Sequence, residues 1–470
     1  MATTSRSQPG KFVTIAALAT APAPAGIAVV RVSGERAKDA LRAVFRGSKD
    51  PIQNPRSLVF GGVVDFHTSA VIDRALVAFM PSPNSYTGED TVEFQFHGSP
   101  LLVQKVLRSL FAFGVVAAEP GEFTKRAFLN GKLDLIQAEA IADLINATSD
   151  EALVIAGEQL KGRLSKLIDQ IAEPLRELLA RTEASIDFAE DGVTSQEVER
   201  TTFELSAAHQ QIVELLKSYD FGHRVRDGLR VLIYGRPNAG KSSLLNLFVG
   251  TRRALVNSRP GTTRDVIEES INIRGYRLIL SDVAGVRDSD DEVEAEGVAL
   301  AREKVGWAHV VLLVVDALEP GDWKGLLTEL IEGGKNVWLI VNKIDSDPGA
   351  FAKFGELPVG IERVFFVSAL TGAGFDPVRD SLVEEISRLR SGIAIGGGEG
   401  GSVVTNERQR ICLVQAEEHI SDALKGVARE GEEITAHHVR LALTALEELV
   451  GRTYTEDLLG RIFSQFCIGK

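Results

Sequence analysis

Short apolar runs that each end in a polar motif mark the middle of the chain. They lie at 231–234, 278–280, 337–341 and 364–367. Unbroken apolar runs of this length are typical of strands that are buried on both faces of a parallel sheet. The helical pattern that begins at Leu244 fits a crossover connection. We therefore predict a doubly wound α/β domain whose motifs lie at the carboxyl ends of its strands, where such sheets bind ligands.

The first 130 residues carry a different, strand-rich pattern. Strand-like runs lie at 26–34, 57–64, 75–80 and 91–98. The last run alternates, so that Glu93, Gln95 and His97 share one face, either merely solvated or functional. Arg31 interrupts the first run; it either faces water from an edge strand or has a charged partner, because buried strands rarely carry a lone arginine. This part is predicted to be an α+β domain.

Helical periodicity flanks the α/β domain on both sides. Apolar residues recur at helical spacing from Asp134 to about Asp191 and again over 195–218, and after the glycine-rich linker 396–401 over 406–429, 436–450 and 455–466. The pattern therefore predicts a discontinuous helical domain into which the α/β domain is inserted. The expected domains are 1–130, N-terminal; 131–222, first helical half; 223–390, α/β; and 391–470, second helical half.

The charge and the cysteine content restrict the kind of protein that this chain can be. The 470 residues carry a net charge of −13, which argues against a broadly basic surface and leaves only a local patch for any RNA. The two cysteines, Cys412 and Cys467, are far apart, as expected for a reducing compartment. No apolar run is long enough to span a bilayer and no secretory signal is recognisable. We expect a cytoplasmic protein without a membrane segment.

The strongest motif is Gly-Arg-Pro-Asn-Ala-Gly-Lys-Ser-Ser at 235–243. It follows a predicted strand and opens a helix, the order that a phosphate-binding loop requires. Gly235 and Gly240 allow the tight turn, and the helix N-terminus favours negative charge. Lys241 is expected to reach the β- and γ-phosphates and Ser242 to bind Mg²⁺. The plainer alternative is a glycine-bearing turn without a ligand.

Three further motifs argue against that alternative. Asp282-Val283-Ala284-Gly285 places a carboxylate where it can hold Mg²⁺ through water, and Ser368-Ala369-Leu370 ends the last strand-like run. Asn342-Lys343-Ile344-Asp345 ends the run before it, and the Asp345 carboxylate can accept the N1–H and 2-amino protons of guanine. Together the motifs predict a guanine-nucleotide domain, an inserted Ras-like P-loop GTPase.

Other segments are specific to one family. The chain resembles the tRNA modification GTPase MnmE (TrmE) family throughout its length, notably at Tyr86-Thr87-Gly88-Glu89-Asp90, at 120–132 with Asp134-Leu135 and Gln137-Ala138-Glu139-Ala140, and at Phe466-Cys467-Ile468-Gly469-Lys470. The resemblance implies a GTP-hydrolysing switch that works with MnmG. Together they would install an aminomethyl or carboxymethylaminomethyl group at C5 of the tRNA wobble uridine. It also implies a homodimer joined through N-terminal domains, and a heterotetramer with MnmG.

The resemblance further implies a one-carbon donor in the N-terminal domain, a 5-formyl- or 5,10-methylene-tetrahydrofolate. The folate site would be lined by Arg31, Glu93, Lys132 and the terminal Lys470. A carboxylate suits pterin N–H donors, and lysines suit the glutamate tail. Cys467 is a candidate for the one-carbon chemistry; the alternative is a small apolar residue that packs the terminus.

The residues expected to carry out GTP hydrolysis differ from those of Ras-like enzymes. Val286 stands where Ras-like enzymes have a water-positioning glutamine, so the resemblance assigns that role to Glu294, whose plain alternative is a solvated acidic loop. Besides Glu294, Lys241 would be catalytic. The charge-stabilising cation would be K⁺, held by Asn238 and by carbonyls of a switch loop that contains Asn257, Arg259 and Thr262.

Asn257 and Pro260 depart from the family pattern of that loop, and Pro260 would stiffen it. Mg²⁺ would bind Ser242 and Thr263. The expected GTP-binding residues are Asn238, Ala239, Gly240, Lys241, Ser242, Ser243, Asn257, Ser258, Arg259, Pro260, Gly261, Thr262, Thr263, Asp282, Val283, Ala284, Gly285, Asn342, Lys343, Asp345, Ser368, Ala369 and Leu370.

Two other functions share part of this pattern. Ribosome-assembly GTPases also carry Asn-x-Gly-Lys-Ser and Gly-Thr-Thr-Arg motifs, but they usually add a basic RNA-binding domain, which is not apparent in this sequence. A folate-dependent one-carbon enzyme that is only regulated by its GTPase domain is the other alternative. Modification of the tRNA distinguishes both from the principal hypothesis.

Overall fold

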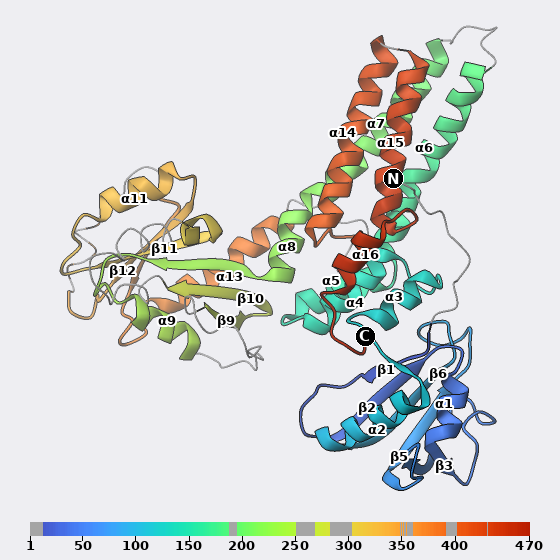
Figure 1. Ribbon diagram of the computed structural model, residues 1–470. Coiled ribbons are helices and arrows are strands. Elements are labelled where there is room, and N and C mark those ends of the chain that lie inside the picture. The colour runs from blue at the N-terminus through green and yellow to red at the C-terminus, as the bar shows by residue number, and fades with distance from the viewer. Residues whose placement is uncertain are drawn as a thin grey trace, which may run out of the picture. The chain divides into compact units, whose positions relative to one another are not determined.

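The computed structural model describes residues 13–187, 195–250, 268–282, 303–347, 349, 351, 354, 361–391, 402–429 and 431–470. The chain forms two compact units (Figure 1). Unit 1 comprises Met1–Ile145, Gln159–His209 and Cys412–Lys470, and unit 2 comprises Asn146–Glu158 and Gln210–Ile411. Unit 2 is thus inserted in the sequence of unit 1.

The N-terminal part of unit 1 is a seven-stranded sheet with the order β3-β4-β5-β6-β2-β1-β7. Its strands are β1 (Ile15–Leu18), β2 (Ala25–Ser33), β3 (Phe45–Gly47), β4 (Val59–Val64), β5 (Val71–Met80), β6 (Thr91–Gly98) and β7 (Val116–Ala117). Helices α1 (Ala37–Val44) and α2 (Pro100–Phe113) share one apolar core with inward-facing strand residues such as Val30, Val77 and Phe94. The expected α+β domain is confirmed.

Helices from both ends of the chain form the remainder of unit 1. They are α3 (Glu122–Leu129), α4 (Leu135–Asn146), α6 (Arg163–Asp187), α15 (Glu432–Val450) and α16 (Glu456–Phe463), with parts of α5 (Asp150–Leu160), α7 (Ser195–Lys217) and α14 (Glu407–Arg429). Figure 1 shows α6, α7, α14 and α15 running side by side. Arg176 of α6 pairs with Glu447 of α15 at 3.4 Å, and His209 of α7 lies 2.6 Å from Glu417 of α14. The helical domain is discontinuous, as predicted.

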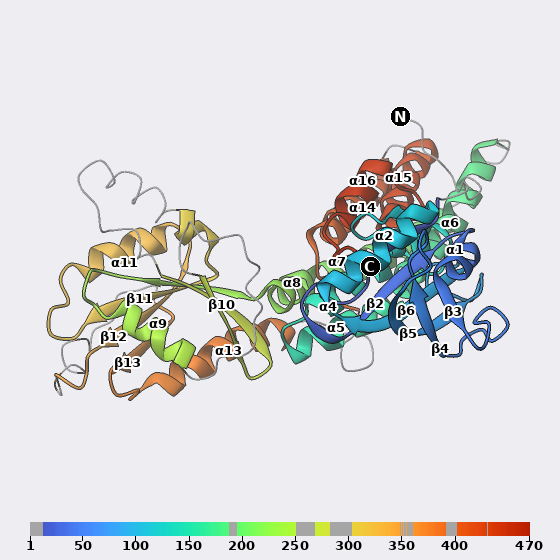
Figure 2. The ribbon, with the colours of Figure 1, turned by 60° about the horizontal axis from the view of Figure 1, so that its bottom comes forward.

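Unit 2 is built on a six-stranded sheet with the order β13-β12-β11-β8-β10-β9. Its strands are β8 (Leu229–Tyr234), β9 (Glu268–Ile273), β10 (Tyr276–Asp282), β11 (Val310–Asp316), β12 (Asn336–Asn342) and β13 (Arg363–Val367), and of these described strands only β9 is antiparallel to its neighbour. Figure 2 shows α11 (Trp323–Glu332) over one face and α9 (Lys241–Gly250) and α13 (Phe375–Ser391) over the other. The doubly wound sheet is confirmed, and its strands are apolar on both faces because helices cover both.

Two segments of unit 2 that are far apart in the sequence pack closely together. Ser218, which precedes α8 (Tyr219–Asp227), accepts a hydrogen bond from the Val404 amide at 3.0 Å. A Cβ at Gly222 would lie 2.1 Å from the Val404 carbonyl oxygen, so the two segments approach each other too closely for a larger residue. In the described part of the chain, no helix is long and apolar enough to cross a membrane.

Candidate nucleotide and folate sites

The phosphate-binding loop joins β8 to α9. Gly235 has φ +145° and a Cβ there would lie 2.3 Å from the Val314 carbonyl oxygen, so the turn requires glycine. Asn238 also adopts a left-handed conformation, with φ +63°. The Lys241 ammonium donates to the Arg236 carbonyl at 2.8 Å, which holds its side chain along the loop. A lysine at this position can turn toward an incoming polyphosphate.

Asn342 connects three of the predicted motifs. Its Nδ2 donates to the Ala239 carbonyl of the phosphate loop at 2.9 Å, and its Oδ1 accepts from the Ala369 amide at 2.9 Å. A Cβ at Gly240 would lie 2.1 Å from Asn342 Nδ2. Asn342 is buried, so both bonds form in a low-dielectric setting where an unpaired amide would be costly. It therefore fixes the phosphate loop against the loop after β13.

A pocket of about 540 Å³ lies between these motifs. It is lined by Gly240, Ser243, Asn246, Leu247, Asn342, Lys343, Asp345, Ser346, Ala369 and Leu370. The Asp345 carboxylate accepts hydrogen bonds from the Ser368 hydroxyl at 2.5 Å and the Ser346 hydroxyl at 3.1 Å. The Ser368 bond is the main reason that the pKa of Asp345 is below its usual value. The carboxylate is therefore a charged acceptor at neutral pH, as recognition of guanine requires.

One residue of this site, Asp316, was not predicted from the sequence. Asp316, at the end of β11, accepts from the Lys343 ammonium at 2.7 Å. Burial alone would raise the pKa of Asp316, but the bond from Lys343 and backbone bonds lower it. The run of apolar residues before Asp316 could have revealed the strand; no local motif indicates that its last residue anchors Lys343.

Ser242, one of the two expected magnesium ligands, lies beside Asp282, the carboxylate expected to hold the ion through water. The Ser242 hydroxyl donates to the Asp282 carboxylate at 3.0 Å. Both are hard oxygen donors at the carboxyl edge of the sheet, and Mg²⁺ binds such ligands together with substrate phosphates and water. The residues present therefore fit a magnesium ion shared with a bound nucleotide.

Part of the predicted site lies outside the described residues. This applies to Asn257, Ser258, Arg259, Pro260, Gly261, Thr262, Thr263, Val283, Ala284, Gly285 and Glu294. The described members, from the phosphate loop to Leu370, are all brought to one end of the sheet. Leu370 is 84% exposed, so its side chain is open to solvent at the pocket.

The second candidate site lies on the N-terminal sheet. Arg31 of β2 faces Glu93 of β6 directly across the ladder, and its guanidinium nitrogens lie 2.9 and 2.8 Å from the Glu93 carboxylate. β2 pairs with β1 and β6, so Arg31 is not on an edge strand. Its guanidinium also lies over the rings of Tyr86 and Phe123 at 5.5 and 5.7 Å. Arg31 thus has the charged partner that its position required.

The chain terminus folds against the same sheet. The Gly469 carbonyl lies 3.5 Å from the Arg31 guanidinium, and the Lys470 carbonyl accepts from the Phe123 amide at 3.2 Å. Gly469 has φ +97° and a Cβ there would lie 2.0 Å from the Leu18 carbonyl oxygen. The Cys467 side chain is exposed, so it does not pack the terminus as a small apolar residue would. Lys132, another predicted folate-site residue, donates to the Pro83 carbonyl at 3.0 Å.

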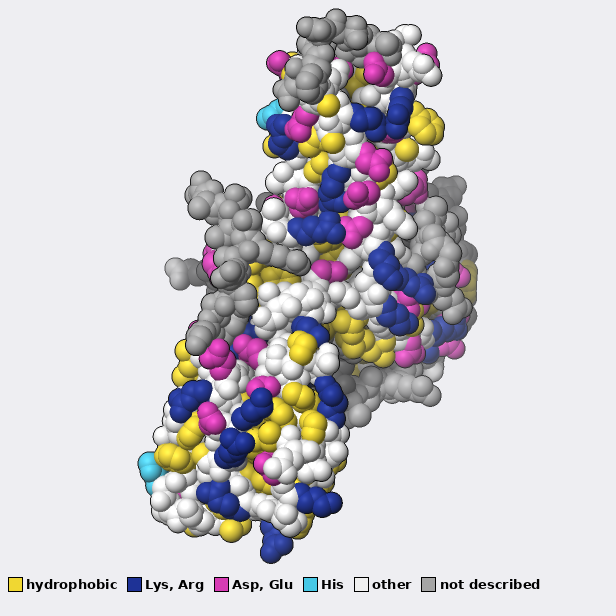
Figure 3. Space-filling view, turned by 90° about the vertical axis from the view of Figure 1, so that its right-hand side faces the viewer, with side chains coloured by type: hydrophobic (Ala, Val, Ile, Leu, Met, Phe, Trp, Pro, Cys, Tyr) yellow, Lys and Arg dark blue, Asp and Glu magenta, His cyan; other side chains and the backbone are white. Residues whose placement is uncertain are grey.

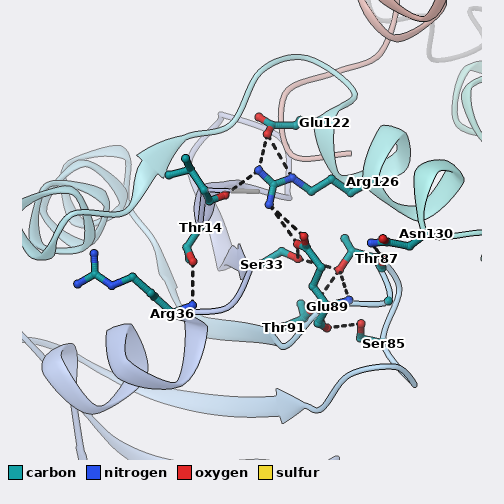
Figure 4. A network of polar contacts seen from close by, with 12 residues as sticks. Thr14, Ser33, Arg36, Ser85, Thr87, Glu89, Thr91, Glu122, Arg126 and Asn130 are labelled. Atoms are coloured by element: carbon teal, nitrogen blue, oxygen red, sulfur yellow. Dashed lines mark hydrogen bonds and ion pairs between the residues drawn. The ribbon is translucent and has the colours of Figure 1, made fainter. Parts of the chain in front are cut away.

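A buried polar network connects two segments of the N-terminal region that are distant in the sequence (Figure 4). Arg126, 3% exposed, contacts the carboxylates of Glu89 and Glu122 at 3.1 and 2.6 Å. The Ser33 hydroxyl donates to Glu89 at 2.7 Å, and Asn130 donates to the Thr87 carbonyl at 2.7 Å. These bonds join the loop 86–90 to the segment 120–132. The fold of the candidate folate-binding region therefore depends on charges that are satisfied only with both segments present.

Comparison with known proteins identifies the family. A family described as "MnmE helical domain" matches residues 135–467, and one described as "GTP-binding protein TrmE N-terminus" matches residues 14–132. The curated tRNA modification GTPase MnmE of Geobacter sulfurreducens is 42% identical over 97% of this chain and 99% of that protein. The protein of the same name from Roseiflexus sp. (strain RS-1) is also 42% identical, with the same shares covered.

A solved structure is similar in part. The G domain of the T. maritima FeoB iron transporter is 31% identical and covers 33% of this chain and 97% of that chain, with a TM-score of 0.26. A score this low adds nothing to the assignment. The sequence relatives, in contrast, match nearly the whole length of both proteins, and the two family matches cover residues 14–132 and 135–467. The chain therefore belongs to the MnmE (TrmE) family of tRNA modification GTPases.

Proposed function

We propose that this chain is a GTP-hydrolysing switch that, together with MnmG, modifies C5 of the tRNA wobble uridine. The observation that carries the proposal is the convergence of the phosphate loop, Asp282, Asn342 and Asp345 at one end of the sheet, in a chain that belongs to a family of tRNA modification GTPases. The proposed domains remain 1–130, 131–222, 223–390 and 391–470, and the active form is a homodimer in the cytoplasm.

In the GTPase site, each residue has a separate task. Asp345 accepts the guanine N–H groups, and Lys241 neutralises phosphate charge. Ser242, with Thr263 and Asp282 behind a water, would hold the magnesium ion, which supplies positive charge to the transferring phosphoryl group. Glu294 positions the attacking water. Potassium would bind Asn238 and the carbonyls of Asn257, Arg259 and Thr262, and would replace the charge of an arginine finger.

The N-terminal sheet is proposed to hold a tetrahydrofolate that supplies the one-carbon unit. Glu93 would accept pterin N–H bonds while Arg31 holds the carboxylate in place. Lys132 and Lys470 would pair with the carboxylates of the glutamate tail. The exposed Cys467 thiol remains a candidate for the one-carbon step.

Loss of the chain is expected to remove the C5-aminomethyl-type wobble uridines. Nucleoside mass spectrometry of tRNA from cells that lack the gene checks this, because the modified nucleosides have characteristic masses. Complementation with the wild-type chain should restore them. An unchanged profile in the deletion strain would refute the proposal, and ribosome-subunit profiles would then test a role in ribosome assembly.

Glu93→Gln is expected to weaken binding of 5-formyl-tetrahydrofolate by about 10- to 100-fold, because it replaces a charge-assisted acceptor by a neutral amide. Calorimetric titration measures the affinity. GTP turnover should not change, and the amide oxygen can still accept from Arg31, so the fold is retained. Glu119→Gln, an exposed change in the same domain, is the matched control. Equal folate affinity of the two variants would exclude Glu93 from the site.

A further inference from the structure

Two stretches of the N-terminal domain, one around α1 and one at α2, carry an excess of positive charge. Residues 36–49 and 100–113, which include α1, β3 and α2, contain seven Lys and Arg and one acidic residue, Asp39, while Glu35 and Asp50 flank the first stretch. In contrast, the whole chain has a net charge of −13. The segment 14–132 is also basic, with 13 Lys and Arg against 10 Asp and Glu. We name as the basic layer the exposed side chains Arg36, Arg42, Arg46, Lys49, Lys105 and Arg108.

Arg42, Lys105 and Arg108 of the basic layer lie on α1 and α2, whereas Arg36 directly precedes α1 and the remaining two lie in or just after β3. α1 and α2 bury Leu41, Val44, Val106 and other apolar residues against one face of the sheet, so their polar residues point away from it. Lys105 and Arg108 are three positions apart in α2 and lie on the same side of that helix. The Arg31–Glu93 pair lies in the ladder between β2 and β6 and is not part of this layer.

The two helices present one continuous surface. The Arg36 guanidinium, at the start of α1, lies 4.7 Å from the centre of the Phe113 ring at the end of α2. The same guanidinium lies 3.3 Å from the position of a Cβ on Gly114. In the lower part of Figure 3, Lys and Arg side chains are distributed over the visible face, with hydrophobic and some acidic side chains among them.

Most of this charge is not neutralised within the protein. Among the residues that the structure describes, Arg42, Lys49, Lys105 and Arg108 form no ion pair, whereas Lys38 pairs with Asp90 at 2.8 Å. Several exposed cations of the helical bundle, in contrast, are paired: Arg440 with Glu183, for example, and Lys425 with Asp422. Unpaired surface cations create a positive potential that attracts polyanions.

We propose that the basic layer binds the phosphate backbone of the tRNA substrate. This inference rests on the proposed function, which makes tRNA the polyanion that the chain must meet. A chain with a large negative net charge repels RNA over most of its surface, so binding requires a local basic region. Structured RNA offers its phosphates and 2′-hydroxyl groups to a protein surface. Exposed arginine and lysine side chains suit such contacts, which position the RNA without reading its sequence.

A triple variant, Arg42→Ala with Lys105→Ala and Arg108→Ala, tests the proposal in the full-length protein. Its affinity for unmodified tRNA is measured by fluorescence anisotropy over a series of salt concentrations. Loss of three phosphate contacts should make the negative slope of log K against log salt less steep by about 2. Binding should also weaken at least about 10-fold near 0.1 M salt. The control triple variant Lys217→Ala, Lys425→Ala, Arg461→Ala removes the same charge from exposed helical positions and should bind tRNA as the wild type does.

GTP turnover and folate affinity should be unchanged in both variants, which would exclude misfolding. An unaltered salt slope in the first variant would overturn the basic layer as an RNA site, as would equal weakening by both variants. It would also be overturned if the wild type bound vesicles of phosphatidylcholine and phosphatidylserine but not tRNA. None of these results would affect the nucleoside profile of the deletion strain, so failure of this inference is distinguishable from failure of the proposed function.

Discussion

Glu294→Ala is expected to lower kcat for GTP hydrolysis by about 100-fold and to leave nucleotide affinity within about threefold of the wild type. Val286 occupies the position that supplies a water-orienting glutamine in Ras-like enzymes, and a valine side chain cannot form a hydrogen bond. Another group must therefore orient the water. A correctly placed acid or base contributes typically 10²- to 10⁴-fold. Single-turnover hydrolysis together with GTP titration separates the chemical step from binding.

The acidic run around Glu294 supplies its own control. Glu292→Ala removes the same charge two positions away and should hydrolyse GTP as the wild type does, so equal turnover in the two variants would remove Glu294 from the mechanism. The wild-type protein should also hydrolyse GTP more slowly when sodium replaces potassium, because the ion's size decides whether the carbonyl oxygens can surround it. Equal rates in the two salts would contradict the proposed potassium site.

Regular elements were predicted where periodicity or a motif marks them. The apolar runs that end in motifs became β8, β10, β12 and β13, and the helical pattern that resumes after residue 405 became α14, α15 and α16. The helices α1 and α2 and the strand β11 were not predicted, because no motif follows them and each is short or lies beside strand-like runs. An element that ends in a ligand-binding motif is easier to predict from the sequence than an element that only packs against others.

The contacts within the sites were harder to predict than their members. Asn342 and Ala239 are 103 positions apart, and Arg31 and Glu93 are 62 positions apart. Both contacts depend on the order and register of strands, which local patterns do not determine. The pair formed by Asp316 and Lys343 is a further example, because β11 and β12 must first pair in parallel. Motifs could therefore indicate the guanine-nucleotide domain, while the contacts within the sites could be described only from the fold.

Asp345→Asn is expected to weaken GTP binding at least about 100-fold and to improve binding of xanthosine triphosphate. The wild-type carboxylate can accept both the N1–H and the 2-amino group of guanine, and each charge-assisted bond is worth about 1.5–3 kcal/mol. Asparagine presents one acceptor and one donor, so the donor meets the 2-amino group of guanine without forming a bond. Xanthine carries a carbonyl oxygen at that place, which the amide can donate to. Competition titrations with the two nucleotides measure the change in their relative affinities.

The surroundings of Asp345 make this variant a specific test. The hydroxyls of Ser368 and Ser346 each donate to one carboxylate oxygen and fix the side chain beside the pocket. The amide that replaces the carboxylate can accept from one hydroxyl through its oxygen and donate to the other through its nitrogen. Asp376→Asn, on the exposed first turn of α13, changes the net charge equally and should retain GTP affinity. If Asp345→Asn bound neither nucleotide, loss of the loop structure would explain the result. Retained preference for GTP would instead show that the pocket beside Asp345 does not recognise the guanine base.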